Sequence, residues 1–365
     1  MKIGFVTTHQ YQNFGTFLQC FALQKILQTL GHDTEIIDYR REEFKRSTVE
    51  EARITIGDFR KNPMSYISNI PAWFLLRERR TLFDKFAKDN FKISQQSWKT
   101  SDDLKLNPPQ YDLYMSGSDQ IWNPAICGFI EPYFLTFAPK NSLKVSYASS
   151  IGLSHLSEIE MEQISIMLST YKFLSCREKT GCKLLADCGY TKVEHVLDPT
   201  LLLDISIWDA MANKSKINKT NYNLCYFLTE TSEKRAQAKE LLSDAKIENL
   251  TTDFRYSKEA ILAAGPYEFL SLIRNAKTIV TDSFHGMLFS ILFCKDFYML
   301  PRHQTTDYNH QNSRIIDMLS SLGLSSRWCP ISKANISPID YTIIKNKINI
   351  LRLHSIEYLQ KVTKV

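Results

Sequence analysis

The first 40 residues constrain the fold more than any other part of the chain, because two apolar segments flank an amphipathic one. Residues 3–8 (IGFVTT) and 34–39 (TEIIDY) predict buried strands, and residues 17–30 predict a helix with apolar side chains at helical spacing. Gly31 supplies the stop signal of this helix. Consecutive strands joined through a helix lie parallel in one sheet. An α/β protein with a parallel sheet is therefore expected.

The alternation of strands and helices continues along most of the 365 residues, which is too long for one ordinary hydrophobic core. Near residue 205 it is interrupted by Pro199 and the polar stretch 212–221. We therefore expect two Rossmann-like domains, over 1–204 and 205–365, that face each other across a cleft.

Two segments stand apart from this regular pattern. A less regular, basic insert is expected over about 40–108, with a helix over 72–90. A final helix over about 338–361 is expected to pack back across the domain junction.

Composition narrows the class of protein. A hydrophobic content of 44% with 23% charged residues is typical of a globular protein. The eight cysteines include no C-x-x-C pair, so reduced thiols are expected rather than a zinc site or disulfides. No apolar stretch approaches the roughly 18 to 20 residues that span a bilayer, and the N-terminus resembles a strand more than a signal peptide. A cytoplasmic protein is expected. The net charge of +6 arises mostly between residues 37 and 100, and no nucleic-acid partner is expected.

Polar, turn-forming residues occupy four loops that follow expected strands, which is where open α/β sheets bind ligands. In the first loop, Asn13, Gly15 and Thr16 open a helix, and the N–H groups of a helix start attract phosphate or carboxylate. A helix cap with a tight turn explains these residues equally well.

The second loop places Gly117, Ser118 and Asp119 after the strand that ends at residue 115. A glycine there lets a backbone approach closely, and Asp119 is a candidate to hold a hydroxyl or act as a base. In the alternative interpretation, Asp119 only forms an Asx-turn with its own backbone.

The third and fourth loops add a cation and a histidine. Arg177 ends the strand expected at 173–177, where a guanidinium can bind a carboxylate or phosphate, or form a salt bridge to a neighbouring carboxylate. His285 follows Ser283 in the first turn of a helix over 285–294, where an imidazole can exchange a proton near neutral pH or serve only the structure. The four loops together predict an anion-binding cleft in a transferase with a phosphorylated donor.

Four motifs carry a resemblance to a known family. The segments YQNFGTFLQCFALQ, GSDQIWNP, SCREKTG with DPTLLL, and TDSFHG with NSRI are similar in order and spacing to polysaccharide pyruvyl transferases, over about residues 3–325. The resemblance implies a GT-B-like fold, phosphoenolpyruvate as donor, a sugar acceptor that is lipid-linked in some systems, and no required metal or cofactor. It also implies that His285 is the catalytic acid or base, that Arg177 contacts the donor, and that Asp119 belongs to the active site.

One position departs from the family pattern. Many relatives have an arginine where this chain has Ser283, so a second donor-binding cation must come from elsewhere. Arg302, Arg314 and Lys277 are candidates by position, with Arg314 in NSRI the first choice.

The resemblance predicts transfer of the enolpyruvyl unit of phosphoenolpyruvate to a sugar of a polysaccharide repeat unit, as a pyruvate ketal, with release of phosphate. Two alternative functions remain. One is a glycosyltransferase of the same fold with a nucleotide-sugar donor, and the other is a non-catalytic binding module.

Residues 71–91 (PAWFLLRERRTLFDKFAKDNF) combine an aromatic helical face with basic flanks. Such a helix suits peripheral contact with anionic lipid at the inner face of the membrane. Packing of the same face on the N-terminal domain is the favoured alternative, because most amphipathic helices of soluble proteins face the core.

Overall fold

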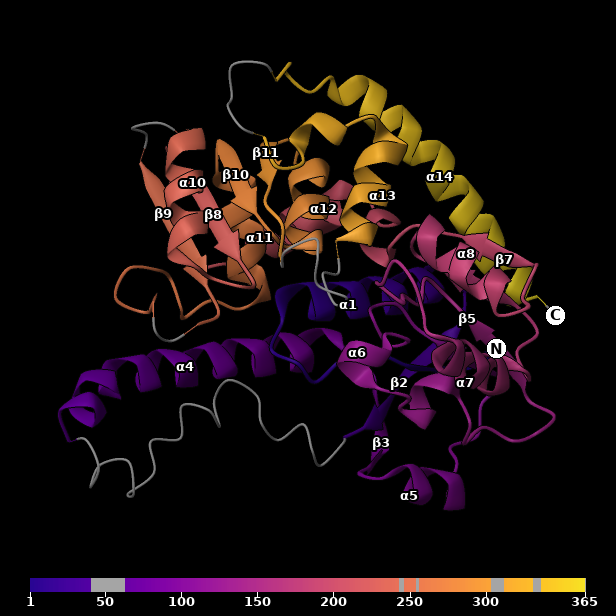
Figure 1. Cartoon of the computed structure of the whole chain (residues 1–365). Coiled ribbons are helices and arrows are strands. Elements are labelled where there is room, and N and C mark those ends of the chain that lie inside the picture. Colours follow the sequence, from indigo (N-terminus) through magenta and orange to yellow (C-terminus); the bar gives the residue numbers. More distant parts are fainter. Residues whose placement is uncertain (41–62, 243–245, 254–255, 303–311, 331–335, 365) are drawn as a thin grey trace.

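The computed structural model describes residues 1–40, 63–242, 246–253, 256–302, 312–330 and 336–364, with the side chains of α4 described from residue 71 onward. The described chain forms two parallel sheets that lie side by side, each with helices packed against it (Figure 1). The early part of the expected basic insert, residues 41–62, lies outside the described residues.

The N-terminal sheet is parallel throughout and has the strand order β3-β2-β1-β4-β5. Bridges from Val145 to Phe173 and from Ser149 to Cys176 extend it towards the pair β6-β7. Its strands are β1 Lys2–Val6, β2 Asp33–Tyr39, β3 Ile93–Trp98, β4 Leu113–Ser116, β5 Leu143–Ser146, β6 Leu174–Cys176 and β7 Val193–His195. Its helices are α1 Phe14–Thr29, α4 Pro63–Asn90, α5 Ser101–Leu106, α6 Pro124–Cys127, α7 Glu158–Leu168 and α8 Lys179–Asp187.

The second sheet is also parallel, with the order β11-β10-β8-β9. Its strands are β8 Asn223–Phe227, β9 Ile247–Thr251, β10 Thr278–Thr281 and β11 Asp296–Met299. The helices of this half are α9 Ile205–Ala212, α10 Ser232–Leu242, α11 Pro266–Asn275, α12 Phe284–Leu292, α13 Ser313–Leu322 and α14 Tyr341–Val362. The prediction of two Rossmann-like α/β units is confirmed.

Each sheet reverses its strand order next to its first strand, between β1 and β4 in one and between β8 and β10 in the other. At such a point the loops that follow the two strands diverge, which leaves a crevice at the carboxyl edge of the sheet. Both crevices open into one pocket, because the loops after β1, β4 and β10 all contribute residues to it.

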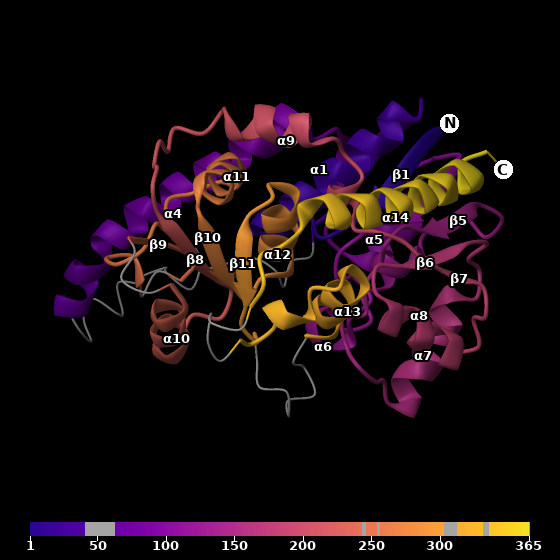
Figure 2. The ribbon, with the colours of Figure 1, turned by 90° about the horizontal axis from the view of Figure 1, so that it is seen from above.

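The two units share a continuous apolar core. Phe14, at the start of α1, stacks on Phe269 of α11 with ring centroids 4.8 Å apart and meets the edge of Tyr226 in β8. The helix α14 runs along both units (Figure 2). Its Lys347 donates to the carbonyl of Leu322 at the end of α13, and its Tyr358 hydroxyl donates to the carbonyl of Ser146 in β5.

The structure differs from the sequence analysis within the expected insert. Residues 93–98 form β3, an edge strand of the first sheet, although they were expected to be irregular. The sequence ISQQSW gave no strand signal because an edge strand exposes much of its surface, and three consecutive positions here are exposed.

The helix α4 runs beneath the second unit and meets the first at its C-terminal end (Figure 1). Phe83 and Phe86 are fully buried, Phe83 against Phe17 and Phe86 against Tyr267 of α11. Phe83 and Phe86 of the aromatic face that was a candidate for lipid contact therefore pack in the core, against both units and not on the N-terminal domain alone. Trp73 and Phe74 remain exposed nearer the start of the helix.

Arg79 of α4 joins the two units. Its guanidinium donates to the carbonyl of Gln12 at 2.9 Å and to that of Ala264 at 3.4 Å. It lies over the rings of Phe14 and Phe83, and burial lowers the pKa of Arg79 to about 10. A buried cation between two carbonyls and two aromatic faces fixes the first loop against the second unit.

Candidate active site

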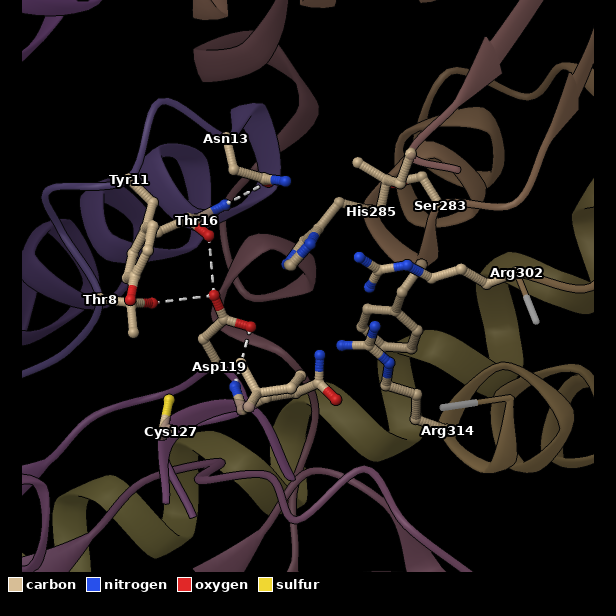
Figure 3. Close-up of a pocket in the computed structure, with 14 residues that line it drawn as sticks. Thr8, Tyr11, Asn13, Thr16, Asp119, Cys127, Ser283, His285, Arg302 and Arg314 are labelled. Carbon is tan, nitrogen blue, oxygen red and sulfur yellow. Dashed lines mark hydrogen bonds between the residues drawn. The ribbon is translucent and has the colours of Figure 1, made fainter. Parts of the chain in front are cut away.

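A pocket of about 200 Å³ lies between the two units, at the carboxyl edges of both sheets. Figure 3 shows side chains converging on it from the loop after β1, from the loop after β4, from the start of α12 and from Arg302 and Arg314. The residues predicted from sequence that line it are Asn13, Thr16, Asp119, Ser283, His285, Arg302 and Arg314.

Asp119 stands at the centre of the N-terminal wall, in a left-handed backbone conformation with φ of 82° that is uncommon outside glycine. Its Oδ2 accepts hydrogen bonds from the hydroxyls of Thr8 (3.0 Å) and Thr16 (2.8 Å). Its Oδ1 accepts from the backbone N–H of Gln120, so the local turn and the place in the pocket coexist.

Cations keep this carboxylate charged although it is buried. Burial alone would raise the pKa of Asp119, but the charges of Arg177, His285 and Arg314 and the hydrogen bond from Thr16 hold that pKa below its usual range. Asp119 therefore offers a hydrogen-bond acceptor to a ligand in the pocket.

The start of α1 forms the adjoining wall. Asn13 caps the helix, since its side chain accepts from the backbone N–H of Thr16 at 3.2 Å, and this is why the helix begins at Phe14 rather than at the expected Phe17. Gly15 does not line the pocket but makes space for its neighbour, because a Cβ atom there would lie 2.0 Å from Nδ1 of His285.

His285 enters from the opposite unit, in the first turn of α12. Ser283 caps this helix by accepting a hydrogen bond from the backbone N–H of Gly286. The imidazole is largely buried, and its Nε2 lies 3.3 Å from Oδ2 of Asp198.

Arg177, predicted to contact the donor, is not among the residues that line the pocket. Its Nη1 donates to Oδ2 of Asp198 at 2.7 Å, and its guanidinium lies 4.6 Å from the ring centroid of Phe284. Burial alone would lower the pKa of Arg177, but the carboxylates of Asp198, Asp119 and Glu178 raise it. The salt bridge, left open as the alternative, is what the structure contains.

Asp198 is the site residue that sequence reasoning missed. Its Oδ1 accepts from the backbone N–H and the hydroxyl of Thr200, as an ordinary helix cap does. The only available signal was an aspartate before a proline just after the strand β7, and this is typical of a cap as well as of a functional carboxylate.

Two arginines supply the positive charge of the C-terminal wall, Arg302 and Arg314. The guanidinium of Arg314 lies 5.4 Å from the ring centroid of Phe284. Burial and repulsion from Arg177 lower the pKa of Arg314 to about 9, against the attraction of Asp119. The third candidate, Lys277, is exposed just before β10, at the edge of the sheet opposite the pocket, so it is wrong as a donor cation.

Gly117 and Ser118 lie behind the pocket wall rather than in it. The backbone N–H of Gly117 donates to the carbonyl of Val6, and the carbonyl of Ser118 accepts from the hydroxyl of Thr7. A Cβ atom at position 117 would approach the Val6 carbonyl to 3.0 Å, so the glycine serves close packing of two strand ends and not approach to a ligand. Pocket residues that sequence reasoning did not assign are Thr8, Tyr11, Gln120, Ile126, Cys127, Leu228 and Phe284.

Within the described part of the chain there is neither a cluster of metal ligands nor a membrane-spanning helix. No group of three or more histidine, cysteine, aspartate or glutamate side chains there is arranged to hold a metal ion. Among the helices within the same residues, none combines the length and the apolar character needed to cross a bilayer.

Solved structures of low sequence identity align with nearly the full chain. UDP-GlcNAc 2-epimerase from Neisseria meningitidis aligns with 10% identity and a TM-score of 0.48, over 98% of this chain and 100% of the other. A UDP-GlcNAc 2-epimerase from Methanocaldococcus jannaschii aligns with 13% identity and a TM-score of 0.49, over 96% and 93%. A glycosyltransferase from Streptomyces sp. SF2575 aligns with 12% identity and a TM-score of 0.40, over 97% and 95%.

Sequence comparison is more specific than these likenesses. No curated protein matches the chain significantly. The sequence model of the family described as polysaccharide pyruvyl transferase matches residues 13–304, a range that includes Asp119, Asp198 and His285. This match extends over more than half of the chain, and the chain therefore belongs to the polysaccharide pyruvyl transferase family of enzymes.

Proposed function

We propose that this pyruvyltransferase takes the enolpyruvyl unit from phosphoenolpyruvate, attaches it to a sugar of a polysaccharide repeat unit as a pyruvate ketal, and releases phosphate. One observation carries the proposal: Arg302, Arg314, His285 and Asp119 line a single pocket. The donor carries a carboxylate and a phosphate, which require cations. The acceptor carries hydroxyls, which require a hydrogen-bond acceptor and a group that moves a proton.

The arginines are suited to the donor anion. A guanidinium binds a carboxylate or phosphate through two parallel hydrogen bonds. The lowered pKa of Arg314 reflects loss of water and the repulsion of neighbouring cations, and an anion in the pocket would counter both. The start of α12, with Ser283 as its N-cap, adds the partial positive charge of a helix N-terminus on the same side. These groups take the place of the arginine that many relatives have at position 283.

The chemistry needs one proton at carbon and one at phosphate. Protonation of the methylene carbon of phosphoenolpyruvate makes C2 electrophilic, and a sugar hydroxyl adds to C2. Phosphate then leaves, and a neighbouring hydroxyl closes the cyclic ketal. Of the two hydroxyl protons lost by the sugar, one is balanced by the new methyl group and the other by the released phosphate. His285 carries the acid–base work in this scheme, because it is the imidazole of the pocket.

Asp119 suits the acceptor side. Thr8 and Thr16 hold its Oδ2, and its charge is maintained by the surrounding cations. An ionised carboxylate in this position can accept a hydrogen bond from a sugar hydroxyl and orient it for attack.

Incubation of the purified enzyme with phosphoenolpyruvate and an isolated repeat unit tests the proposal. Phosphate release together with a mass increase of the repeat unit is expected, and His285→Ala should lower turnover by about 10² to 10⁴-fold while the protein stays folded. Thermal protection by a nucleotide sugar but not by phosphoenolpyruvate would favour a glycosyltransferase instead. Unchanged biological activity of His285→Ala would favour a binding module.

A further inference from the structure

Both oxygens of the Asp198 carboxylate accept hydrogen bonds from residues other than His285. Thr200 donates its backbone N–H and its hydroxyl to Oδ1, at 3.0 and 2.7 Å. Arg177 donates to Oδ2 at 2.7 Å from a side chain that is fully buried. Of these donors, the backbone amide of Thr200 and the guanidinium of Arg177 cannot become acceptors, since they carry only N–H groups.

This arrangement restricts the state of the imidazole. Burial alone would raise the pKa of Asp198, but His285, Arg177 and the backbone N–H of Thr200 hold that pKa well below its usual range. The carboxylate is then an acceptor only, so the Nε2 atom 3.3 Å from it must carry hydrogen to form a bond.

The other ring nitrogen faces the opposite way. Nδ1 of His285 lies next to Gly15, and it makes no hydrogen bond to the described part of the chain. His285 also lines the pocket. With Nε2 committed to Asp198, Nδ1 is the ring atom that remains for a ligand.

We propose that Asp198 is a positioning residue, supported by Arg177 and Thr200, that fixes the neutral form of the His285 imidazole as the Nε2–H tautomer and makes Nδ1 the atom that exchanges a proton with the substrate. The catalytic part of this inference rests on the proposed function, whereas the tautomer does not. Arg177 then acts through Asp198 and not by contact with the donor, and Gly15 keeps Nδ1 uncovered.

Asp198→Asn is the informative variant. An amide oxygen that faces Thr200 keeps both hydrogen bonds of Oδ1, and the NH₂ group then replaces Oδ2, at the cost of the hydrogen bond from Arg177. The amide NH₂ would then face His285 and require an unprotonated Nε2, which moves the proton to Nδ1. In serine proteases the corresponding change costs about 10⁴-fold in kcat through the wrong tautomer, and a loss of about 10² to 10⁴-fold is expected here with little change in donor KM.

A second buried pair of the same kind supplies a matched control. Nε2 of His9 lies 3.0 Å from Oδ1 of Asp38, both side chains are buried, and neither lines the pocket. Nδ1 of His9 differs in lying 3.2 Å from the carbonyl of Thr7. Asp38→Asn should change the signal of His9 but leave the signal of His285 and the turnover number unchanged.

The test is ¹⁵N NMR of the enzyme labelled at histidine, at a pH where the imidazole is neutral, with the His285 signal assigned from a His285→Gln spectrum. The wild type should show protonated Nε2, and Asp198→Asn should shift the proton to Nδ1. Protonated Nδ1 in the wild type would overturn the inference, and this measurement needs no variant that alters Asp198. No substrate is present, so a failure of pyruvyl transfer from phosphoenolpyruvate would leave this readout unaffected.

Discussion

The Nδ1 atom of His285 lies 2.0 Å from the place that a Cβ atom would take at position 15. A side chain at position 15 in α1 and the imidazole of His285 in α12 therefore cannot both fit. Real Cβ contacts essentially never come this close. The first turn of one unit therefore determines how far the imidazole of the other unit can enter the pocket.

Gly15→Ala should displace the imidazole and lower turnover by about 10²-fold or more, the scale of lost acid–base catalysis. The fold should persist, because alanine favours a helix over glycine by about 1 kcal/mol. Steady-state kinetics and the melting temperature are the measurements. Lys25→Ala, on the exposed side of the same helix, is the control and should keep full activity. Full activity of Gly15→Ala would show that the pocket adapts without loss.

Arg314→Lys should raise the KM for phosphoenolpyruvate, because lysine keeps the charge but not the two-pronged hydrogen bonding of a guanidinium. A change of about tenfold or more is expected, since hydrogen bonds to charged groups contribute about 1.5 to 3 kcal/mol. Lys277→Gln is the control, since Lys277 is exposed at the other edge of the sheet. An unchanged KM in Arg314→Lys would transfer the donor contact to Arg302.

Phosphate release from phosphoenolpyruvate and acceptor should continue after treatment with EDTA. The prediction rests on the sequence, in which no cysteine, histidine or carboxylate cluster has ligand spacing. Loss of activity on chelation, with recovery on addition of one particular metal, would contradict it.

Acid should destabilise the protein partly through Asp119. Its folded pKa lies below the unfolded value of about 3.9, so its contribution to stability is present above that pH and is lost as the pH falls towards the folded pKa. The melting temperature of Asp119→Asn should therefore fall less steeply between about pH 5 and pH 3 than that of the wild type. Asp84→Asn, at an exposed pair with Arg80, should follow the wild type. If the melting temperature changed equally with pH in all three proteins, Asp119 would not contribute to the acid sensitivity.

Binding to anionic vesicles at low salt is expected to depend on the exposed part of α4. Trp73 and Phe74 are 39% and 56% exposed, and Arg77 lies over the Trp73 ring. Replacement of Arg77 and Arg80 by glutamine should weaken co-sedimentation, since each basic residue near such a surface contributes about 1 kcal/mol. Arg79 is left unchanged because it is buried, and Lys239→Gln serves as the charge control. A wild type that stays in the supernatant at low salt rules the contact out.

Local sequence determined the main elements of the fold and much of the pocket. Strand and helix periodicity identified the parallel units, because each pattern reports the face that a segment buries. Asp119 and His285 could be named because they follow strands, and the carboxyl ends of parallel strands meet at one edge of a sheet. Among the strands that the structure describes, β3, whose polar residues are exposed, escaped this reasoning.

Tertiary structure decided the partners of these residues. Nothing in the sequence near Arg177 indicates that its side chain meets Asp198, or that Asp198 meets His285 across 87 positions of the chain. In the same way, the sequence of α4 is amphipathic whether its aromatic face meets lipid or Phe17 and Tyr267. Such choices depend on which distant surfaces pack together, since an ion pair or an apolar face is stabilised only by the particular group that covers it.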